Sequence, residues 1–454
     1  MSELPKGWTL CSLGEIGLWS SGGTPSRTNR DFFGGTIHWI KSGDLPDGPI
    51  LRTDEAITEL GLEQSAAKLL PVNTICIALY GATIGRLGIT TFPAATNQAV
   101  ANLIPNLDLI NVKYAFYFLK SARSYFVGLG QGGAQPNISQ QIVRETEIPI
   151  APFAEQKRIA DKLDVLLSRV DSCRERLDRV PAILKRFRQS VLAAATSGKL
   201  TDDWRGDPSN STGLPSTWTN CLIKDAGRIQ LGRQRSPKFH AGDNMRPYLR
   251  VQNVFEDRID LSDVMTMDFP GEDFVRYKLS PGDILLNEGQ SPQFLGRPAI
   301  YRGELPDCCF TNTLIRFQAN NDVLPDYAML VFRNHMHSGR YVTEGRITTN
   351  IAHLGAGRFG TVEFPKPSLE EQVEIVRRTR ILLAHSTLIE STLAGSIHRI
   401  QRLTPSILDR AFRGELVPQD PDNEPAEELL NRINDNKATC SRRAKRARIQ
   451  KVQV

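Results

Sequence analysis

Polar side chains gather in short loops that occur in two versions along this 454-residue chain, and these side chains are the ones best suited to binding chemistry. The segments HWIKSGDL and YLRVQNVF correspond to each other, with Lys41 opposite Arg250 and Asp44 opposite Asn253. Lysine, arginine, asparagine and glutamine side chains form hydrogen bonds along the edge of a planar ligand such as a nucleic-acid base. The loops therefore indicate a surface that reads a ligand edge, although simple drift of loop residues would give the same contrast.

Three further pairs of loops share a framework and differ in their polar residues: YGATIGRLGI and NEGQSPQFLGRPAIY, ATNQAV and FTNTLI, GAQPNISQQ and GRITTNIAHL. A duplicated scaffold with a diversified contact surface would produce this pattern. The candidate contact residues are polar or cationic residues of these loops and of nearby basic segments: Arg27, Lys41, Ser42, Arg86, Asn97, Gln98, Asn137, Arg233, Arg235, Lys238, Arg250, Gln252, Asn253, Gln290, Gln293, Asn312 and Asn350.

No segment of the sequence forms a recognisable catalytic constellation. The segment TSGKL lacks the first glycine and the Ser or Thr of a phosphate-binding loop. The chain has no Pro-Pro dipeptide, which excludes the Asp/Asn-Pro-Pro-aromatic loop of amino-methyltransferases. The seven histidines are dispersed, and the seven cysteines include no C-x-x-C pair. We therefore expect no catalytic residue, no metal site and no cofactor bound by this chain.

The basic net charge of +6 is concentrated at the C-terminus. Residues 437–454 contain seven basic and no acidic side chains, which leaves 49 basic and 50 acidic side chains elsewhere. A phosphate-binding surface must therefore come from local clusters, of which the clearest spans residues 224–250. We expect the tail to be disordered and solvated. The alternative interpretation is an arm that binds phosphates nonspecifically. No apolar run approaches the ~20 residues of a membrane helix, and no signal peptide is evident, so we expect a cytoplasmic protein.

The chain contains a long internal duplication. LPKGWTLCSLGEIG at the start recurs as LPSTWTNCLIKDAG 210 residues later, with Trp8 opposite Trp218. Further on, IPIAPFAEQKRIADKLDVLLSRV matches FPKPSLEEQVEIVRRTRILLAHS at an offset of 216, as does SVLAAATSGKL with SILDRAFRGEL. So long a period indicates two domain-sized repeats rather than a solenoid. We expect the recurring tryptophans to be structural.

Each repeat ends in a predicted helical region. Apolar residues of the first region recur in steps of four and three, which is a heptad seam. The second region is less regular, because Thr379 and Ser386 interrupt its stripe, and Pro181 and Pro405 are expected to kink or break the helices. Mutual packing about a pseudo-twofold axis is preferred over two ordinary core helices. The expected pairing residues are Ile159, Leu163, Leu166, Val170, Leu177, Ile375, Leu382, Ile389 and Leu393.

The module before each helical region has short apolar runs between turn residues, together with segments of helical periodicity. The predicted fold is therefore α/β, with two mixed α/β domains separated by long paired helices. The predicted divisions are a first domain (1–152), a first helical region (153–200), a linker (201–216), a second domain (217–366), a second helical region (367–417) and a C-terminal tail (418–454).

Several of these segments together carry a resemblance to a known family. LPKGW, WIKSGDL, GATIG, IPIAPFAEQKRIADKLDVLLSRVD, ILKRFRQSVLAAATSGKLTDDWR, EEQVEIVRR and SILDRAFRGELVPQD resemble the specificity subunit of type I restriction-modification enzymes. The similarity covers residues 4–420 and is most specific in the two helical regions.

The resemblance implies two target-recognition domains, each reading one half of a split, asymmetric sequence in double-stranded DNA. Two methyltransferase subunits would dock along the helices and use S-adenosylmethionine to methylate adenine at N6. Restriction subunits would add cleavage dependent on ATP and Mg. Those cofactors would belong to the partners, and this chain would supply no catalysis.

Two other classes of function remain open at this point. A stand-alone enzyme is opposed by the missing catalytic constellation. A coiled-coil scaffold with two protein-binding modules is opposed, more weakly, by the chemistry of the loops. Methyl transfer by the purified chain would favour the enzyme, and salt-insensitive partner binding without a DNA footprint would favour the scaffold.

Overall fold

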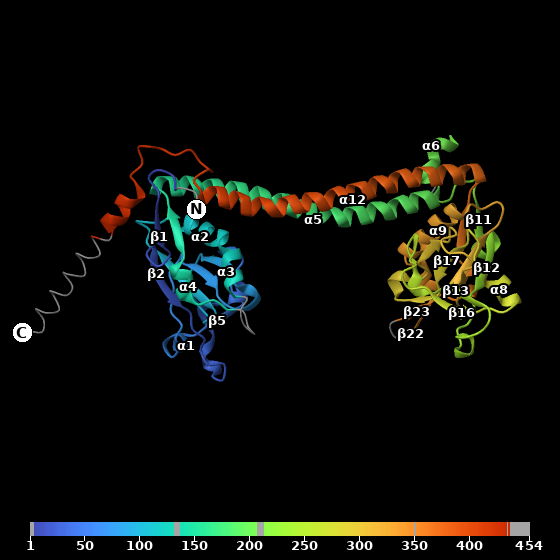
Figure 1. Cartoon of the computed structure of the whole chain (residues 1–454), viewed down its shortest axis with the longest axis horizontal. Coiled ribbons are helices and arrows are strands. Elements are labelled where there is room, and N and C mark those ends of the chain that lie inside the picture. Colours follow the sequence, from blue (N-terminus) through green and yellow to red (C-terminus); the bar gives the residue numbers. More distant parts are fainter. Residues whose placement is uncertain (1–3, 131–136, 207–212, 349–350, 434, 436–454) are drawn as a thin grey trace, which may run out of the picture. The chain divides into compact units, whose positions relative to one another are not determined.

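The computed structural model describes residues 4–130, 137–206, 213–348, 351–433 and 435. The chain divides into two compact units, Met1–Arg176 with Ser396–Val454, and Leu177–Gly395. Two long helices, α5 (Phe153–Ser197) and α12 (Leu369–Phe412), each contribute to both units (Figure 1).

The first unit contains a mixed α/β module of three small sheets in its described part. The sheets have the strand orders β1-β10, β2-β9-β6-β7-β4 and β5-β3-β8. Their strands are β1 (Thr9–Ser12), β2 (Gly17–Ser21), β3 (Phe33–Ile40), β4 (Gly48–Ile50), β5 (Glu55–Ile57), β6 (Ile75–Ala78), β7 (Leu87–Thr90), β8 (Ala94–Thr96), β9 (Val100–Pro105) and β10 (Glu147–Ile150). The helices are α1 (Glu59–Glu63), α2 (Val112–Ser121), α3 (Arg123–Leu129) and α4 (Gln140–Glu145).

The second unit contains a module with corresponding sheets, β11-β24, β12-β21-β17-β19 and β16-β13-β20, together with β14-β15 and β18-β23-β22. Its strands are β11 (Thr219–Leu222), β12 (Gly227–Leu231), β13 (Met245–Leu249), β14 (Val254–Phe255), β15 (Arg258–Ile259), β16 (Met265–Asp268), β17 (Ile284–Asn287), β18 (Gly289–Gln290), β19 (Pro298–Ile300), β20 (Cys309–Phe310), β21 (Leu314–Ala319), β22 (Arg346–Thr348), β23 (Ile351–His353) and β24 (Glu363–Lys366). Its helices are α6 (Asp202–Arg205), α7 (Ile223–Ala226), α8 (Glu272–Tyr277), α9 (Pro325–His337), α10 (Arg340–Glu344) and α11 (Ala356–Gly360).

The two modules share a common set of strand pairings, which confirms the α/β duplication predicted from the sequence. β3 pairs with β5 in antiparallel and with β8 in parallel orientation, and β13 pairs in the same way with β16 and β20. The first and last strands of each module pair with each other, β1 with β10 and β11 with β24. The chain therefore enters and leaves each module at neighbouring points.

A buried glutamine fixes each long helix to its own module. The Gln156 side chain donates to the Leu109 and Ala151 carbonyls at 3.1 and 2.9 Å, and it accepts from the backbone of Asn111. Gln372 repeats the arrangement with the carbonyls of Asp322 and Pro367. Because a buried amide without partners is costly, these contacts hold the start of each helix in one orientation.

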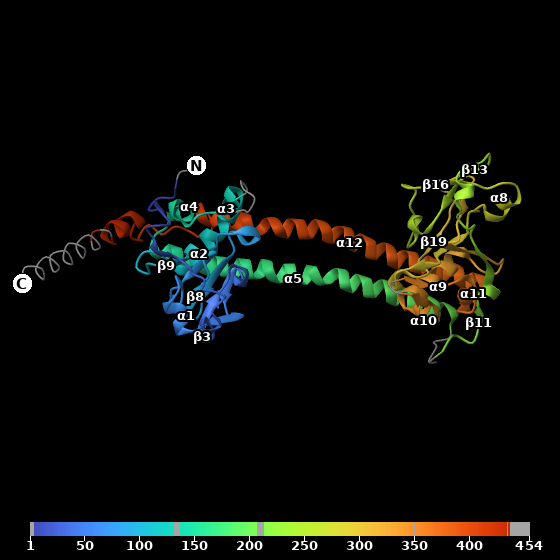
Figure 2. The same cartoon turned by 90° about the horizontal axis from the view of Figure 1, so that it is seen from below.

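Within each unit, part of α5 packs beside part of α12 (Figures 1 and 2). In the first unit, Leu163 and Leu167 share a core with Leu408 and Ala411. In the second unit, Arg188 pairs with Glu390, and the Arg378 side chain donates to the Leu200 carbonyl. As α5 advances, its neighbours on α12 recede, so the two helices are antiparallel in this unit.

The seam differs from the predicted one in several residues. Thr379 and Ser386, expected to interrupt the stripe, are each 1% exposed, whereas Ile389 is 50% exposed. A strict sevenfold repeat drifts around a 3.6-residue helix, and small side chains allow neighbouring elements to approach closely. Of the other predicted pairing residues, Ile159, Leu163, Val170, Ile375 and Leu393 are buried, and Leu166, Leu177 and Leu382 are half-buried.

Neither proline ends its helix. Pro181 lies inside α5 and Pro405 inside α12, so of the predicted kink or break, a break is wrong at both prolines. Each helix continues past its proline despite the lost backbone hydrogen bond, and buried residues lie in the part of the helix that follows. The buried Leu184 and Val191 follow Pro181, and Leu408 and Ala411 follow Pro405.

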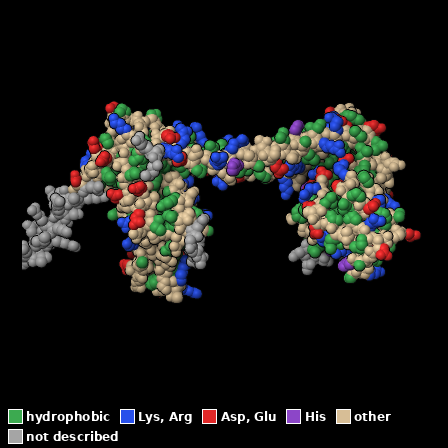
Figure 3. Space-filling model, in the orientation of Figure 1, with side chains coloured by type: hydrophobic (Ala, Val, Ile, Leu, Met, Phe, Trp, Pro, Cys, Tyr) green, Lys and Arg blue, Asp and Glu red, His purple; other side chains and the backbone are tan. Residues whose placement is uncertain are grey.

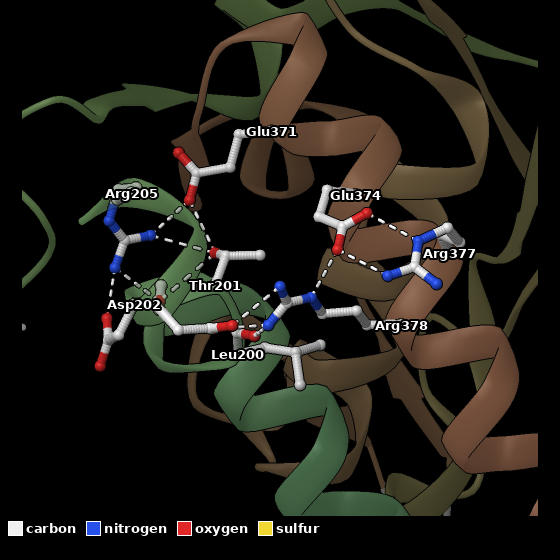
Figure 4. Close-up of polar contacts among 10 residues, drawn as sticks. Leu200, Thr201, Asp202, Arg205, Glu371, Glu374, Arg377 and Arg378 are labelled. Atoms are coloured by element: carbon white, nitrogen blue, oxygen red, sulfur yellow. Dashed lines mark hydrogen bonds and ion pairs between the residues drawn. The ribbon is translucent and has the colours of Figure 1, made fainter. Parts of the chain in front are cut away.

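The predicted linker begins with an ordered anchor. The Thr201 hydroxyl donates to Glu371 Oε1 at 2.7 Å, and the Arg205 guanidinium pairs with the same carboxylate (Figure 4). The Arg205 side chain is 6% exposed and that of Glu371 is 3% exposed. Residues 201–205 are therefore part of the second unit rather than a free connection.

The predicted disordered tail is also ordered over its first part. Ala426 and Leu429 are buried in the core of the first unit, and the Ala426 amide donates to the Gly7 carbonyl at 2.9 Å. Apolar residues spaced for one helical face explain this packing, since Leu430 and Ile433 join the same core. The basic residues 437–454 lie outside the described residues.

Candidate nucleic-acid interface

The two loops that first indicated a reading surface form the same turn. In the first module, the Lys41 amide donates to Asp44 Oδ2 at 2.9 Å, closing a 3-10 turn after β3. In the second, the Arg250 amide donates to Asn253 Oδ1 at 3.0 Å after β13. In each turn the first residue is a cation, Lys41 or Arg250, and its backbone N–H is held by the acidic or amide side chain three residues later. An equivalent backbone therefore presents lysine in one module and arginine in the other.

Each of these cations is held by a carboxylate from a neighbouring segment. Lys41 Nζ lies 2.7 Å from Glu55, which also pairs with Arg27 at 2.9 Å. The hydrogen bond with Lys41 lowers the pKa of the Glu55 carboxyl. Arg250 pairs with Asp263 at 2.5 Å, and its side chain is 15% exposed. Both cations are thus held in one orientation by a charge-assisted hydrogen bond.

Further candidates join these turns at the carboxyl ends of parallel strands. Asn97 follows β8, and its backbone N–H donates to the carbonyl of Ile40, the residue directly before Lys41. The exposed Gln98 side chain accepts from Thr24. In the second module the exposed Asn312 follows β20, the parallel partner of β13. Parallel strands place their carboxyl ends together, so one edge of each module brings these side chains to a common surface.

The next pair of loops contains a residue that the sequence reasoning missed. Arg86 was predicted as a contact residue, but its counterpart Arg297, 211 residues later, was not. Both follow a glycine with positive φ, Gly85 and Gly296. The Arg297 guanidinium lies over the rings of Phe255 and Phe294, at 4.6 and 5.3 Å from their centroids. The same repeat register that aligned Lys41 with Arg250 could have identified it.

The two arginines are presented differently. Arg86 is exposed, whereas Arg297 is partly buried and its pKa is lowered by that burial. Stacking on two rings fixes the plane of the Arg297 guanidinium, which favours recognition of a planar group.

The remaining candidates lie in loops around these turns. Asn137 is exposed and bridges to Tyr80. Gln252 and Gln293 are exposed, whereas Ser42 and Gln290 are partly buried. A hydrogen bond from the Glu288 amide to the Thr313 carbonyl brings the start of the Gln290 strand beside the Arg250 turn. Asn350 lies outside the described residues.

Two predicted contact residues are buried and support the scaffold instead. Arg233 donates to the Asp268 carbonyl, pairs with Asp273 at 2.8 Å and lies 3.7 Å from the Phe239 ring centroid. Asn253 donates to the Asp260 and Asp263 carbonyls at 3.0 and 2.9 Å. Because their polar atoms are engaged inside the module, we reassign both residues to positioning roles.

The basic segment 224–250 is less basic in space than in sequence. Arg233, Arg246 and Arg250 pair with acidic residues from later segments, Asp273, Asp307 and Asp263. Arg235 and Lys238 remain exposed. On the face drawn in Figure 3, basic and acidic side chains are interspersed over each unit. These loops therefore do not present a uniform positive field.

This chain is similar in sequence to known specificity subunits. The family model for the type I restriction modification DNA specificity domain matches residues 5–182. The EcoKI specificity subunit of Escherichia coli (strain K12) is 28% identical over 430 residues, covering 92% of this chain and 91% of that protein. The StySPI specificity subunit of Salmonella potsdam has the same identity and coverage. This chain is a homologue of type I restriction enzyme specificity subunits.

Solved structures share the fold of these specificity-subunit homologues. The HsdS subunit from Thermoanaerobacter tengcongensis aligns with a TM-score of 0.60 at 18% identity, covering 91% of this chain and 98% of that chain. A chain from a structure of a type I R-M system, described for its complex assembly and conformational transition, aligns with a TM-score of 0.67 at 18% identity. That alignment covers 91% of this chain and 100% of the other.

Other features of this specificity-subunit homologue lie apart from the reading loops. A cavity of about 700 Å³ in the second unit is lined by α5, α9 and α12, and none of the predicted contact residues lines it. Among the described residues, no helix has the length and apolar character needed to cross a membrane.

Proposed function

We propose that this chain is the DNA sequence-recognition subunit of a type I restriction-modification complex and that each module reads one half of a split, asymmetric sequence. The observation that carries the proposal is the repeated turn after β3 and β13. Its backbone hydrogen bonds agree, while its side chains offer Lys41 and Ser42 in one copy and Arg250 and Val251 in the other. One scaffold thus presents two different hydrogen-bonding patterns.

Recognition would combine base contacts with phosphate contacts. Arginine or lysine contacts a guanine edge, and asparagine or glutamine contacts adenine, at about 1–3 kcal/mol of discrimination for each bidentate pair. Exposed cations such as Arg86, Arg235 and Lys238 would contact phosphates and fix the register. Since the chain outside its tail is near neutral, its own affinity for DNA would be low, and partner subunits would supply further contacts to the DNA.

Catalysis belongs to those partners in this proposal. Two methyltransferase subunits would use S-adenosylmethionine to methylate adenine at N6 after flipping the base, and restriction subunits would supply cleavage dependent on ATP and Mg. This chain would contribute sequence recognition alone, in the cytoplasm where the genome lies. Salt-insensitive binding to a protein partner without a DNA footprint would contradict this role.

Lys41→Ala and Arg250→Ala should each reduce methylation at the recognised sequence by about 10- to 100-fold, because each removes a pre-oriented cation worth about 1–3 kcal/mol. Co-expression with a candidate methyltransferase, followed by mapping of modified adenines, measures the effect. Lys113→Ala and Lys366→Ala serve as matched controls, since each removes an ion-paired lysine outside the loops. Loss of subunit assembly in either test variant would contradict its assignment as a contact residue.

A further inference from the structure

The anchor in the second unit satisfies both oxygens of one buried carboxylate. Trp218 Nε1 donates to Glu371 Oε2 at 2.9 Å. Glu371 Oε1 accepts from the Thr201 hydroxyl at 2.7 Å and from the Arg205 guanidinium (Figure 4). A neutral donor and a cation therefore compensate for taking this charge out of water.

The equivalent carboxylate in the first unit has only one of these three contacts. Trp8 Nε1 donates to Glu155 Oε2 at 3.2 Å, as Trp218 does to Glu371. Glu155 is 1% exposed, and its Oε1 atom is buried without a hydrogen-bond partner. Burial raises the pKa of Glu155, and the hydrogen bond from Trp8 and the charge of Arg158 oppose that effect only in part.

The sequence explains the missing contacts. At the offset of 216 that aligns the two helical regions, Val417 stands where Thr201 would be, and Pro421 stands where Arg205 would be. Neither side chain can donate a hydrogen bond. The duplication has kept the tryptophan and the carboxylate in the first unit but not the donors that satisfy them in the second.

A cavity of about 350 Å³ occupies this place in the first unit. Its lining includes Trp8, Glu155 and Pro421, together with the carboxylates of Asp420 and Glu427, and Lys6 is its one basic lining residue among the described residues. Asn423 also lines it, and its amide nitrogen is buried without a partner. The cavity thus combines an unsatisfied carboxylate oxygen, further negative charge and an unsatisfied donor suited to a peptide carbonyl.

We propose that this cavity binds the guanidinium or ammonium group of a basic side chain from a protein segment that does not form its walls. That group occupies at Glu155 the position that Arg205 occupies at Glu371, and the Asn423 amide donates to a carbonyl of the same segment. The source is either a separate protein chain or the basic residues 437–454 of this chain. The inference is independent of the proposed DNA recognition.

N-acetyl-arginine amide tests the proposal on the full chain labelled with fluorotryptophan, whose five tryptophans give resolvable ¹⁹F signals. The Trp8 signal, assigned with Trp8→Phe, should shift saturably as the probe is added. The Trp218 signal should not shift, because Arg205 already occupies its carboxylate. N-acetyl-citrulline amide is the matched control, since it has the same shape without the charge. An equal response to both probes, or no saturable response of Trp8, would overturn the proposal.

Two variants locate the binding group on the protein. Glu155→Gln should weaken the binding of the arginine probe at least about tenfold, which is equivalent to about 1.4 kcal/mol of binding free energy. The double variant Val417→Thr with Pro421→Arg keeps Glu155 but should abolish probe binding, because an internal guanidinium then fills the cavity as Arg205 does in the second unit. Undiminished binding in a folded double variant would contradict the site, even if Glu155→Gln fails to fold.

The source of the natural group is distinguished by neutralising the tail in the full-length chain. Changing its seven basic residues to glutamine should strengthen binding of the arginine probe if the tail is the occupant, because a competitor is removed. Unchanged probe affinity would assign the occupant to a separate protein chain. The residues to change are Lys437, Arg442, Arg443, Lys445, Arg446, Arg448 and Lys451.

Discussion

Arg205→Ala should lower the free energy of unfolding of the second unit by about 3 kcal/mol, because removing one partner of a buried ion pair leaves the other charge uncompensated. The Arg205 and Glu371 side chains are 6% and 3% exposed, so water does not replace the lost guanidinium. Arg205 also donates to the Gly198 carbonyl at 2.7 Å, where α5 has ended, and this contact is lost as well.

Chemical denaturation followed by hydrogen exchange measures this loss of stability. Hydrogen exchange gives the stability of each unit separately and reports directly on the backbone amides around Trp218. Arg377→Ala is the matched control, because Arg377 pairs with Glu374 at the surface with its side chain 58% exposed, and this variant should cost far less stability than Arg205→Ala. Adding Glu371→Gln to Arg205→Ala should restore part of the lost stability. Equal costs for the two arginine variants would refute the buried anchor.

Arg205 also illustrates what the sequence reveals and what it conceals. The repeat register predicted both modules and the starts of both long helices, because glycine, tryptophan and apolar positions recur with the fold. It could not predict the role of Arg205, because the segment TDDWRGDP has the composition of a linker and its acidic partner lies 166 residues away. Only the folded chain brings the two charges together.

The candidate interface shows the same division. The correspondence of Lys41 with Arg250 follows from the register, and the structure reproduces it as one turn. The burial of Arg233 and Asn253 does not follow from the register. A polar side chain in a loop can form hydrogen bonds with a ligand or with its own module, and the residue type does not distinguish the two cases. The seam has a comparable limit, because Thr379 and Ser386 are buried through close packing that a pattern of apolar residues does not record.

Replacing residues 217–366 with the corresponding domain of a relative should change one half of the methylated sequence and leave the other half unchanged. The structure permits the exchange, because β11 and β24 pair from Thr219 with Lys366, so the segment begins and ends at adjacent points. Each base pair in the changed half contributes about 1–3 kcal/mol, and several together exceed a thousandfold in preference.

Mapping of modified adenines after co-expression with the methyltransferase gives the result for both halves at once. The reciprocal exchange of residues 1–152 is the matched control and should change the opposite half, since β1 and β10 close the first module in the same way. A change in both halves from either exchange would mean that the modules do not read DNA independently. In that case, the shared turn after β3 and β13 would reflect a common scaffold rather than two separate reading surfaces.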